Sequence, residues 1–275
     1  MNKVIITGAR GFVGSYLLRY LKKKNFNVVG LSRQKNRNLY YIKDYLKIKK
    51  EPAFLIYLSE ESNIFNFNKL STLQIKKNQK ILKVLSAKFE NKFIYASSSK
   101  VYTDKLRIKL KETSKIKAET KYEKNKIQCE KIVLKNKGIV LRISNIYGDK
   151  IKKESIFLKI IRQIKNKKKE NLHLNNTNHI RDFLYIDDLS RLIELIISNP
   201  KTGIYNVGSG RGLSISNLLK LIFKIFKKKR KIVVKDKNIY FSSQILNTNR
   251  AYKTFNWKPK FSIYKQLDKV IKKYD

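Results

Sequence analysis

The sequence has few of the residues that cross-link, stiffen or interrupt a chain. Among its 275 residues there are one cysteine, three prolines, ten glycines and one tryptophan. Because Cys129 has no second cysteine to pair with, an internal disulfide is excluded, and we expect a reducing, cytoplasmic setting. No apolar run approaches the roughly 20 residues of a membrane helix, and the apolar stretch near the N-terminus is too short to predict a signal peptide.

Acidic residues are also scarce, with 20 Asp and Glu against 64 Lys and Arg, for a net charge of +44. Such a charge attracts polyanions at low salt, as a nucleic-acid or anionic-membrane partner would require. The lysines are scattered, however, and lack the accompanying aromatic residues that stack on bases. Lysine and asparagine each have a codon made of A and T alone, so an AT-rich genome gives the same profile. We therefore interpret the charge as composition bias and do not predict nucleic-acid binding.

The hydrophobic residues, 42% of the chain, follow the pattern of an α/β protein. The first segments are a short buried strand at 3–7, a glycine-rich turn at 8–14, a helix at 13–24 and a second strand at 27–31. Further strands are predicted at 54–58, 92–96, 138–143 and 204–207, with helices at 72–89, 115–136 and 187–198. This order predicts a Rossmann-type, doubly wound parallel sheet.

The alternation of strands and helices weakens after residue 148. We predict that residues 1–148 plus about 181–207 form a dinucleotide-binding domain. The rest, about 149–180 plus 208–275, is predicted to form a smaller, mixed α/β lobe that binds substrate. No linker rich in proline, glycine or serine separates the two parts, so the lobe is expected to be interleaved with the first domain.

The glycine-rich turn fits the pattern G-x-x-G-x-x-G and lies between a predicted strand and a predicted helix. Gly8 permits the tight turn, Gly11 lets the backbone approach a pyrophosphate, and Gly14 lets the helix pack on the strand. The first N–H groups of the helix then face the phosphates. The residues of this turn that we expect at the cofactor are Gly8, Arg10, Gly11, Phe12, Val13 and Gly14.

The end of the second predicted strand bears on the choice of cofactor. A carboxylate there would accept hydrogen bonds from the adenine ribose and repel a 2′-phosphate. This chain has Ser32 and Arg33 instead, and a hydroxyl with a guanidinium suits a 2′-phosphate. We therefore favour NADP(H). NAD(H) stays open, because Arg33 can equally be a solvated arginine of a basic protein.

A serine, a tyrosine and a lysine supply the candidate chemistry. Ser98 stands at the end of the strand predicted at 92–96, which is the ligand side of an open α/β sheet. Tyr122 and Lys126 are four residues apart in a predicted helix and so share a face. A nearby ammonium favours the phenolate of a tyrosine, and a serine hydroxyl can hold the substrate oxygen. Together they could move a proton while hydride passes to or from a nicotinamide.

These segments, in this order, resemble the extended short-chain dehydrogenase/reductase family, in the branch that acts on sugar nucleotides. The resemblance covers nearly the whole chain. It rests on residues 7–14 (T-G-x-x-G-x-x-G), 97–102 (S-S-x-x-V-Y), 141–148 (L-R-x-x-N-x-Y-G), 181–188 (R-D-F-x-Y-V-x-D), 205–210 and 257–259. It implies that Ser98, Tyr122 and Lys126 are catalytic, with Tyr122 and Lys126 also touching the cofactor. The residues implied at the substrate are Ser98, Ser99, Asn145 and Arg181.

The same resemblance implies further cofactor contacts, and it also shows two departures. Asp44 would contact the adenine, and Leu58 and Ser59 the nicotinamide side. Residues 57–60 read Tyr-Leu-Ser-Glu where the family has H-L-A-A. The dehydratases of the family carry Asp-Glu directly after the catalytic hydroxyl, whereas this chain has Ser99 and Lys100, so loss of water by that route is not expected. A homodimer paired through the helix of Tyr122 is also implied.

Three functions remain open at this point. The first is an NADP(H)-dependent 4-ketoreductase that makes a deoxysugar nucleotide for cell-surface polysaccharide. The second is a sugar-nucleotide C4 epimerase that uses the same residues with tightly held NAD. The third is a non-catalytic protein on the same fold that senses nucleotides or binds polyanions. The net charge and the altered segment at 57–60 support this third function.

No metal site is predicted. His173 and His179 lack carboxylate or cysteine ligands at metal-binding spacing. Cys129 lies one helical turn beyond Lys126, and without a paired histidine we interpret it as a buried, inert thiol.

Overall fold

Seven parallel strands form the central sheet of the computed structural model, in the order β11-β7-β5-β4-β1-β2-β3. They are β1 (Lys3–Thr7), β2 (Val28–Ser32), β3 (Tyr40–Tyr41), β4 (Ala53–Tyr57), β5 (Phe93–Ser98), β7 (Ile139–Ile143) and β11 (Gly203–Val207). The order reverses between β1 and β4, where an open α/β sheet has its ligand crevice. The predicted Rossmann-type sheet is thus confirmed. The structure describes residues 3–104, 108–148, 155–166, 171–174, 176–227, 231–234 and 241–272.

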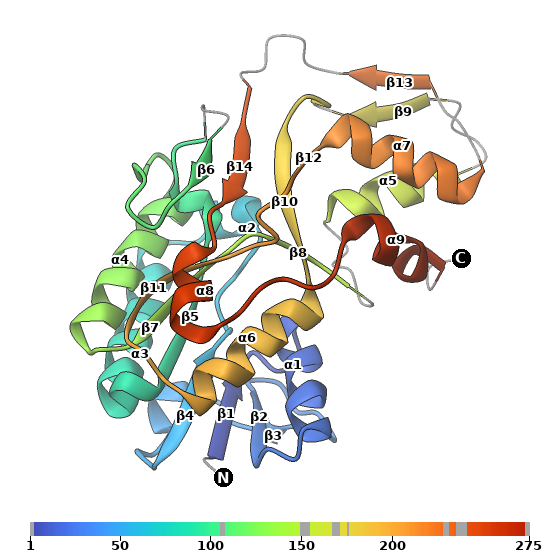
Figure 1. The fold of residues 1–275 in the computed structure, drawn as a ribbon. Helices are drawn as coiled ribbons and strands as arrows, with labels where there is room; N and C mark the ends of the chain where they lie inside the picture. Colours follow the sequence, from blue (N-terminus) through green and yellow to red (C-terminus); the bar gives the residue numbers. More distant parts are fainter. Residues whose placement is uncertain are drawn as a thin grey trace.

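Helices cover both faces of this sheet (Figure 1). The helices α1 (Phe12–Lys23) and α6 (Ile186–Ser198) pack on one face, and α3 (Thr72–Phe89) and α4 (Lys121–Lys135) on the other. Because successive residues of a strand point to opposite faces, Val4 and Ile6 join the first core and Ile5 joins the second. Shorter elements are α2 (Ile64–Asn68), α8 (Asn249–Phe255) and the 3-10 helices η1 (Tyr45–Lys47), η2 (Glu90–Lys92) and η3 (Ser99–Val101).

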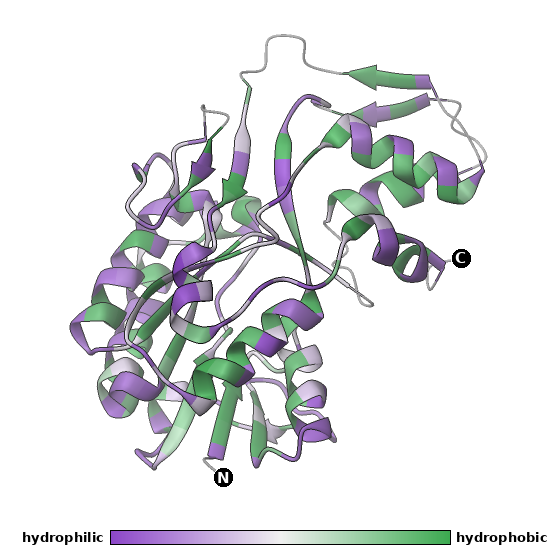
Figure 2. Ribbon diagram, in the orientation of Figure 1, coloured by the Kyte–Doolittle hydropathy of each residue, from purple (hydrophilic) through white to green (hydrophobic). Residues whose placement is uncertain are grey.

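A second, smaller lobe lies beyond the carboxyl ends of the central strands (Figure 1). Its strands are β6 (Lys109–Leu110), β8 (Asn145–Tyr147), β9 (Asn171–Leu174), β10 (Ile180–Tyr185), β12 (Gly212–Ser214), β13 (Lys231–Val234) and β14 (Ser243–Leu246). Its helices are α5 (Ile156–Lys165), α7 (Ile215–Phe226) and α9 (Ile263–Lys272). Figure 2 shows hydrophobic stretches along α5 and α7, and these helices share a separate core with α9. None of the helices in the described residues is long and apolar enough to span a membrane.

The helix that carries Tyr122 begins later than predicted. It starts at Lys121, whereas the sequence pattern suggested residue 115. Thr120 and Glu123 explain the difference, because they form a capping box that starts the helix. The Thr120 Oγ1 accepts from the Glu123 N–H at 3.2 Å, and the Glu123 carboxylate accepts from the Thr120 N–H at 2.9 Å. The cap places Tyr122 in the first turn of α4 and Lys126 one turn further on.

Candidate active site

The glycine turn follows β1 at the point where the strand order reverses. Gly8 has φ +67, and a Cβ there would lie 2.6 Å from the Leu58 carbonyl oxygen. A Cβ on Gly14 would lie 2.4 Å from the Gly8 carbonyl oxygen, so both glycines are required by close packing of backbone. Gly11 differs, since a Cβ there would meet only the Gly8 oxygen, at 3.2 Å. At Gly11 the missing side chain therefore leaves the backbone open to the approach of a ligand.

The N-terminus of α1 opens directly onto this turn. Gly11 is the N-cap, and within the described residues no side chain caps the helix and no acidic residue stands in its first turn. The first N–H groups of a helix need acceptors, and the helix dipole favours an anion there. The turn and the uncapped helix therefore suit a pyrophosphate, and the cofactor contacts expected of this segment stay a prediction.

Arg33 and Tyr45 flank the glycine turn on the side of β2. Ser32 is buried at the end of that strand, and its hydroxyl donates to the Gln34 carbonyl oxygen at 2.8 Å. The exposed Arg33 guanidinium lies 5.5 Å from the centre of the Tyr45 ring. The Gly8 N–H in turn donates to the Tyr45 hydroxyl at 3.4 Å. Tyr45, which sequence reasoning missed, thus connects the arginine to the turn.

Asp44 has a structural role in this region. Its carboxylate accepts from the Leu46 N–H at 3.0 Å and caps the 3-10 helix η1. The cap fixes the start of η1 and with it the position of the buried Tyr45 side chain. The adenine contact expected of Asp44 stays a prediction.

Tyr122 and Lys126 lie on one face of α4, as their spacing predicted. The Lys126 Nζ is 5.7 Å from the centre of the Tyr122 ring. The tyrosine is buried, with the Phe67 ring packed edge-on against it at a centroid distance of 5.5 Å. The Tyr122 N–H donates to the Asn68 side chain at 3.0 Å, so α2 holds the first turn of α4 in place.

Lys126 is engaged by a glutamate from a different part of the chain. Its Nζ donates to the Glu60 Oε2 at 2.6 Å and to the Ala96 carbonyl oxygen at 2.8 Å. The side chains of Lys126 and Glu60 are each 6% exposed. The Tyr95 hydroxyl donates to the same Glu60 oxygen at 2.7 Å, and the Asn125 amide donates to the other oxygen at 3.3 Å. Glu60 is therefore fully engaged on both oxygens.

The buried Glu60 carboxylate and Lys126 ammonium each stabilise the charged form of the other. Burial alone would raise the pKa of Glu60, but the Lys126 ammonium holds it below its ordinary value. Burial would lower the pKa of Lys126, and the Glu60 carboxylate more than reverses this, so the pKa is raised. Both groups are accordingly ionised at neutral pH.

Ser98 ends β5, two residues after the carbonyl that Lys126 contacts. Its Oγ accepts from the Lys100 N–H at 3.2 Å and caps η3. Its neighbour Ser97 donates instead to the buried Glu130, and Ser99 is buried. In the described part of the chain no hydrogen bond joins the Ser98 and Tyr122 hydroxyls. The catalytic role expected of Ser98 and the substrate contact expected of Ser99 stay predictions.

Two of the predicted substrate residues, Asn145 and Arg181, lie on strands of the smaller lobe. The Asn145 side chain on β8 donates to the Asp182 carbonyl oxygen at 3.2 Å. The Arg181 guanidinium on β10 donates to the carbonyl oxygens of Ile180 at 2.8 Å and Ser242 at 3.0 Å. Burial and the nearby charge of Arg181 lower the pKa of Lys100 to about 8. Lys100 and Arg181 thus place two basic side chains near each other, and the substrate contact expected of Arg181 stays a prediction.

The N-terminal three quarters of the chain, residues 4–208, match the model of the NAD-dependent epimerase/dehydratase family. The chain belongs to this family. Its members include the nucleotide-sugar enzymes that the motifs resembled, so the predicted resemblance is confirmed.

Two curated relatives within this family illustrate its range. The chain is 26% identical to a dTDP-D-glucose 4,6-dehydratase of Dictyostelium discoideum over 82% of its own length, and spans 62% of the length of that relative. It is 24% identical to a dTDP-4-dehydro-6-deoxyglucose reductase of Escherichia coli, over 98% of this chain and 97% of the relative. Both relatives are named for reactions of nucleotide sugars, one a dehydratase and the other a reductase.

One solved structure shares this fold over nearly its full length. RMD from Pseudomonas aeruginosa, complexed with NADPH, superposes with a TM-score of 0.85 at 22% identity, over 100% of this chain and 99% of that one. The superposition confirms the α/β fold along its full length.

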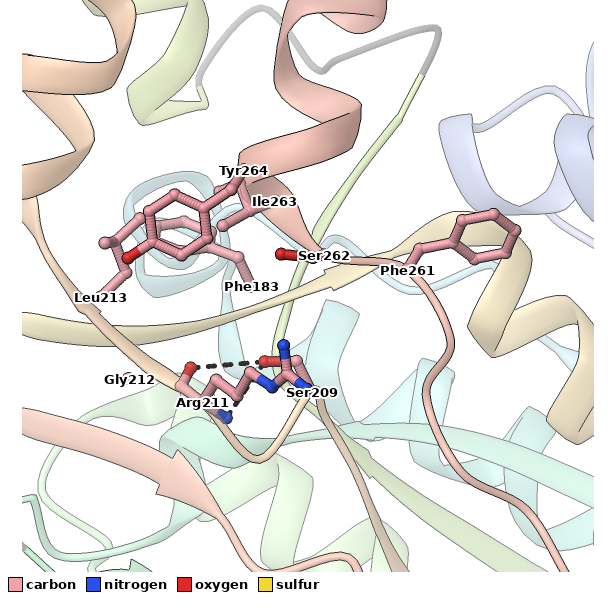
Figure 3. A pocket seen from close by; sticks show the side chains of 9 residues that line it. All are labelled: Phe183, Ser209, Arg211, Gly212, Leu213, Phe261, Ser262, Ile263 and Tyr264. Carbon is pink, nitrogen blue, oxygen red and sulfur yellow. Dashed lines mark hydrogen bonds between the residues drawn. The ribbon is translucent and has the colours of Figure 1, made fainter.

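The smaller lobe also contains a hollow that sequence reasoning did not identify. Figure 3 shows the Arg211 side chain beside Ser209 on one side of it and the Tyr264 ring from α9 on another. Phe183 contributes from β10, two residues beyond Arg181 and so on the same face of the strand. The full lining is Phe183, Ser209, Arg211, Gly212, Leu213, Phe261, Ser262, Ile263 and Tyr264.

Cys129 packs against the Glu60 side of the site. It is buried, and its Sγ lies 3.6 Å from the Glu60 Oε1. Burial and the Glu60 charge raise the pKa of the thiol well above its ordinary value, so it stays protonated. Among the described residues no group of three His, Cys, Asp or Glu side chains could hold a metal ion.

Proposed function

We propose that this protein is an NADP(H)-dependent reductase of 4-keto sugar nucleotides, which makes a deoxysugar nucleotide for cell-surface polysaccharide. The observation that carries the proposal is the buried Tyr122–Lys126 pair beside the strand end of Ser98. The uncapped N-terminus of α1 and the exposed Arg33 supply the cofactor end. The name of the Escherichia coli relative supports the substrate class.

The proposed reaction divides the work among three side chains. Ser98 Oγ holds the substrate carbonyl oxygen, and Tyr122 donates its phenolic proton to that oxygen as negative charge develops on it. Lys126 stabilises the tyrosinate left behind and binds the cofactor ribose. The bound cofactor supplies the hydride.

The cofactor and substrate occupy different parts of the fold in this proposal. The glycine turn binds the pyrophosphate, Ser32, Arg33 and Asp44 lie at the adenosine end, and Leu58 and Ser59 lie at the nicotinamide end. Residues 1–148 plus about 181–207 hold the cofactor and also contribute the strands β6, β8 and β10 to the smaller lobe. The rest of that lobe, about 149–180 plus 208–275, holds the nucleotide sugar. Ser99, Asn145 and Arg181 contact the substrate, and two copies pair through α4.

Arg33→Ala tests the cofactor assignment. We expect the affinity for NADPH to fall about 10-fold, the effect of one lost hydrogen bond to a charged group, and that for NADH to change by less than about twofold. Fluorescence titration of the purified variant measures both dissociation constants. Arg37→Ala, at another exposed arginine of the same loop, is the matched control and should leave both unchanged. An equal loss for the two cofactors in Arg33→Ala would remove the preference for NADP(H).

The second candidate is an NAD-dependent C4 epimerase. One observation favours it. The Ser32 hydroxyl is already hydrogen-bonded to the Gln34 backbone, so it is less available to bind a 2′-phosphate. An epimerase regenerates its cofactor in each turnover and retains it. Extraction of the purified protein therefore separates the two, because retained NAD supports the epimerase and an empty site that prefers NADPH supports the reductase. Protein that neither holds nor binds a nicotinamide cofactor would contradict both.

A further inference from the structure

Glu60 stands at the centre of the candidate site, although neither the motifs nor the family match gives it a role. It follows β4, and the chain brings it to Lys126 across 66 residues of sequence. We propose that Glu60 is a positioning residue that keeps Lys126 charged and aimed before the cofactor binds. The proposal rests on the proposed function, because the ribose of a nicotinamide cofactor is the ligand toward which Lys126 is held.

The hydrogen-bond inventory of Lys126 supports this role. An ammonium has three donors, and two of them are directed at Glu60 and at the Ala96 carbonyl oxygen. One donor is left for a cofactor hydroxyl. Glu60 is itself held by hydrogen bonds from Tyr95 and Asn125. The lysine ammonium is therefore held in one position before any ligand binds. This ordering lowers the entropy cost of binding.

Among the described residues, Glu60 is the only acidic side chain that forms an ion pair with Lys126. The other titratable groups that face the pair are Tyr57 on β4, Tyr95 on β5, and Tyr122 and Cys129 on α4. Burial raises the pKa of Tyr57, Tyr95 and Cys129, so these three stay neutral at neutral and mildly alkaline pH. None of them can replace the carboxylate.

Without the carboxylate, Lys126 would keep the Ala96 carbonyl and two aromatic rings. The Tyr95 and Tyr122 ring centres lie 4.8 and 5.7 Å from its Nζ. Burial lowers the pKa of an ammonium that lacks a counter-ion, so Lys126 would lose its proton as the pH rises. The loss would show as cofactor affinity that falls with increasing pH, whereas the wild-type lysine stays charged and its affinity stays flat.

Glu60→Gln is the decisive variant, because the amide keeps the shape of the side chain while it removes the charge and replaces one acceptor oxygen with a donor. We would introduce it into Tyr122→Phe, so that ionisation of the tyrosine hydroxyl cannot contribute. The dissociation constant of NADPH, or of NADH if the wild type prefers it, is measured by fluorescence from pH 7 to 9.5. We expect affinity to fall at least about 5-fold over this range in Glu60→Gln and to stay constant in its parent. Adding Lys126→Arg should restore a flat profile, since a guanidinium stays protonated.

Glu130→Gln is the matched control, as Glu130 is an equally buried glutamate in an ion pair of α4 that does not touch Lys126. Its profile should stay flat, and circular dichroism verifies the fold of each variant. If Glu60→Gln does not fold, Glu60→Ala takes its place with the same expectation. A flat profile in the Glu60 variant, with wild-type binding intact, would overturn this role alone. Failure of the wild type to bind either cofactor would overturn the proposed function and this role with it.

Discussion

Tyr122→Phe should lower kcat at least about 100-fold, the usual scale for loss of an acid–base group, while the cofactor dissociation constant changes by less than about twofold. The variant removes one hydroxyl and keeps the ring that packs against Phe67, so the first turn of α4 is preserved. The measurement is the rate of NADPH oxidation with a 4-keto sugar nucleotide, together with a fluorescence titration of the cofactor.

Tyr20→Phe is the control for this experiment. The Tyr20 hydroxyl donates to Glu194 on the opposite face of the sheet, away from Lys126. Its removal should leave kcat within about twofold, since the group is not an acid or base for the reaction. Turnover close to that of the wild type in Tyr122→Phe would exclude the mechanism proposed for the tyrosine.

Glu130→Ala should cost about 3–5 kcal/mol of unfolding free energy, the loss expected when a buried ion pair loses one partner. The Arg142 guanidinium donates to Glu130 from Nε at 3.0 Å and from Nη2 at 2.7 Å, and the two side chains are 5% and 4% exposed. The pair joins α4 to β7, and Arg142 also donates to the Tyr102 hydroxyl at 3.0 Å. Removal of the carboxylate leaves a charged guanidinium in the core. Urea unfolding at pH 7 measures the difference.

An exposed ion pair of this chain serves as the comparison. Asp268 and Lys272 are 2.8 Å apart on α9, with side chains 45% and 68% exposed. Asp268→Ala should cost less than about 1 kcal/mol, because solvent screens such pairs. If Glu130→Ala cost no more than Asp268→Ala, the buried pair would contribute no specific stability.

The parts of the fold that the sequence predicted well are those set by local pattern. The helix at 72–89 is found with the predicted bounds, since a Ser71–Gln74 capping box starts it and its apolar residues recur at helical spacing. The strand at 3–7 and the glycine turn were also predicted from local pattern, namely a short apolar run followed by closely spaced glycines. The helix of Tyr122 was predicted about six residues too long at its start, because the capping box of Thr120 was not recognised.

What could not be predicted depends on contacts between distant segments. The strands β12 and β14 of the smaller lobe have only three and four residues and pair with β10 from distant parts of the sequence, so their local pattern is weak. The Tyr122–Lys126 pair was identified from its spacing. Its partner Glu60 could be seen only as a departure from the family segment at 57–60, and its contact with Lys126 arises from tertiary packing.

The order in which the chain builds its sheet has a consequence for synthesis on the ribosome. β11, which pairs with β7, and α6, which covers the face of β1, both follow the strands β8 and β10 of the smaller lobe. Until residue 207 has emerged, the nascent sheet keeps an unpaired edge at β7 and an uncovered apolar face, both of which invite misassembly. The central sheet therefore cannot be completed before the smaller lobe has begun to form, and we expect a fragment that stops at residue 148 to aggregate rather than fold.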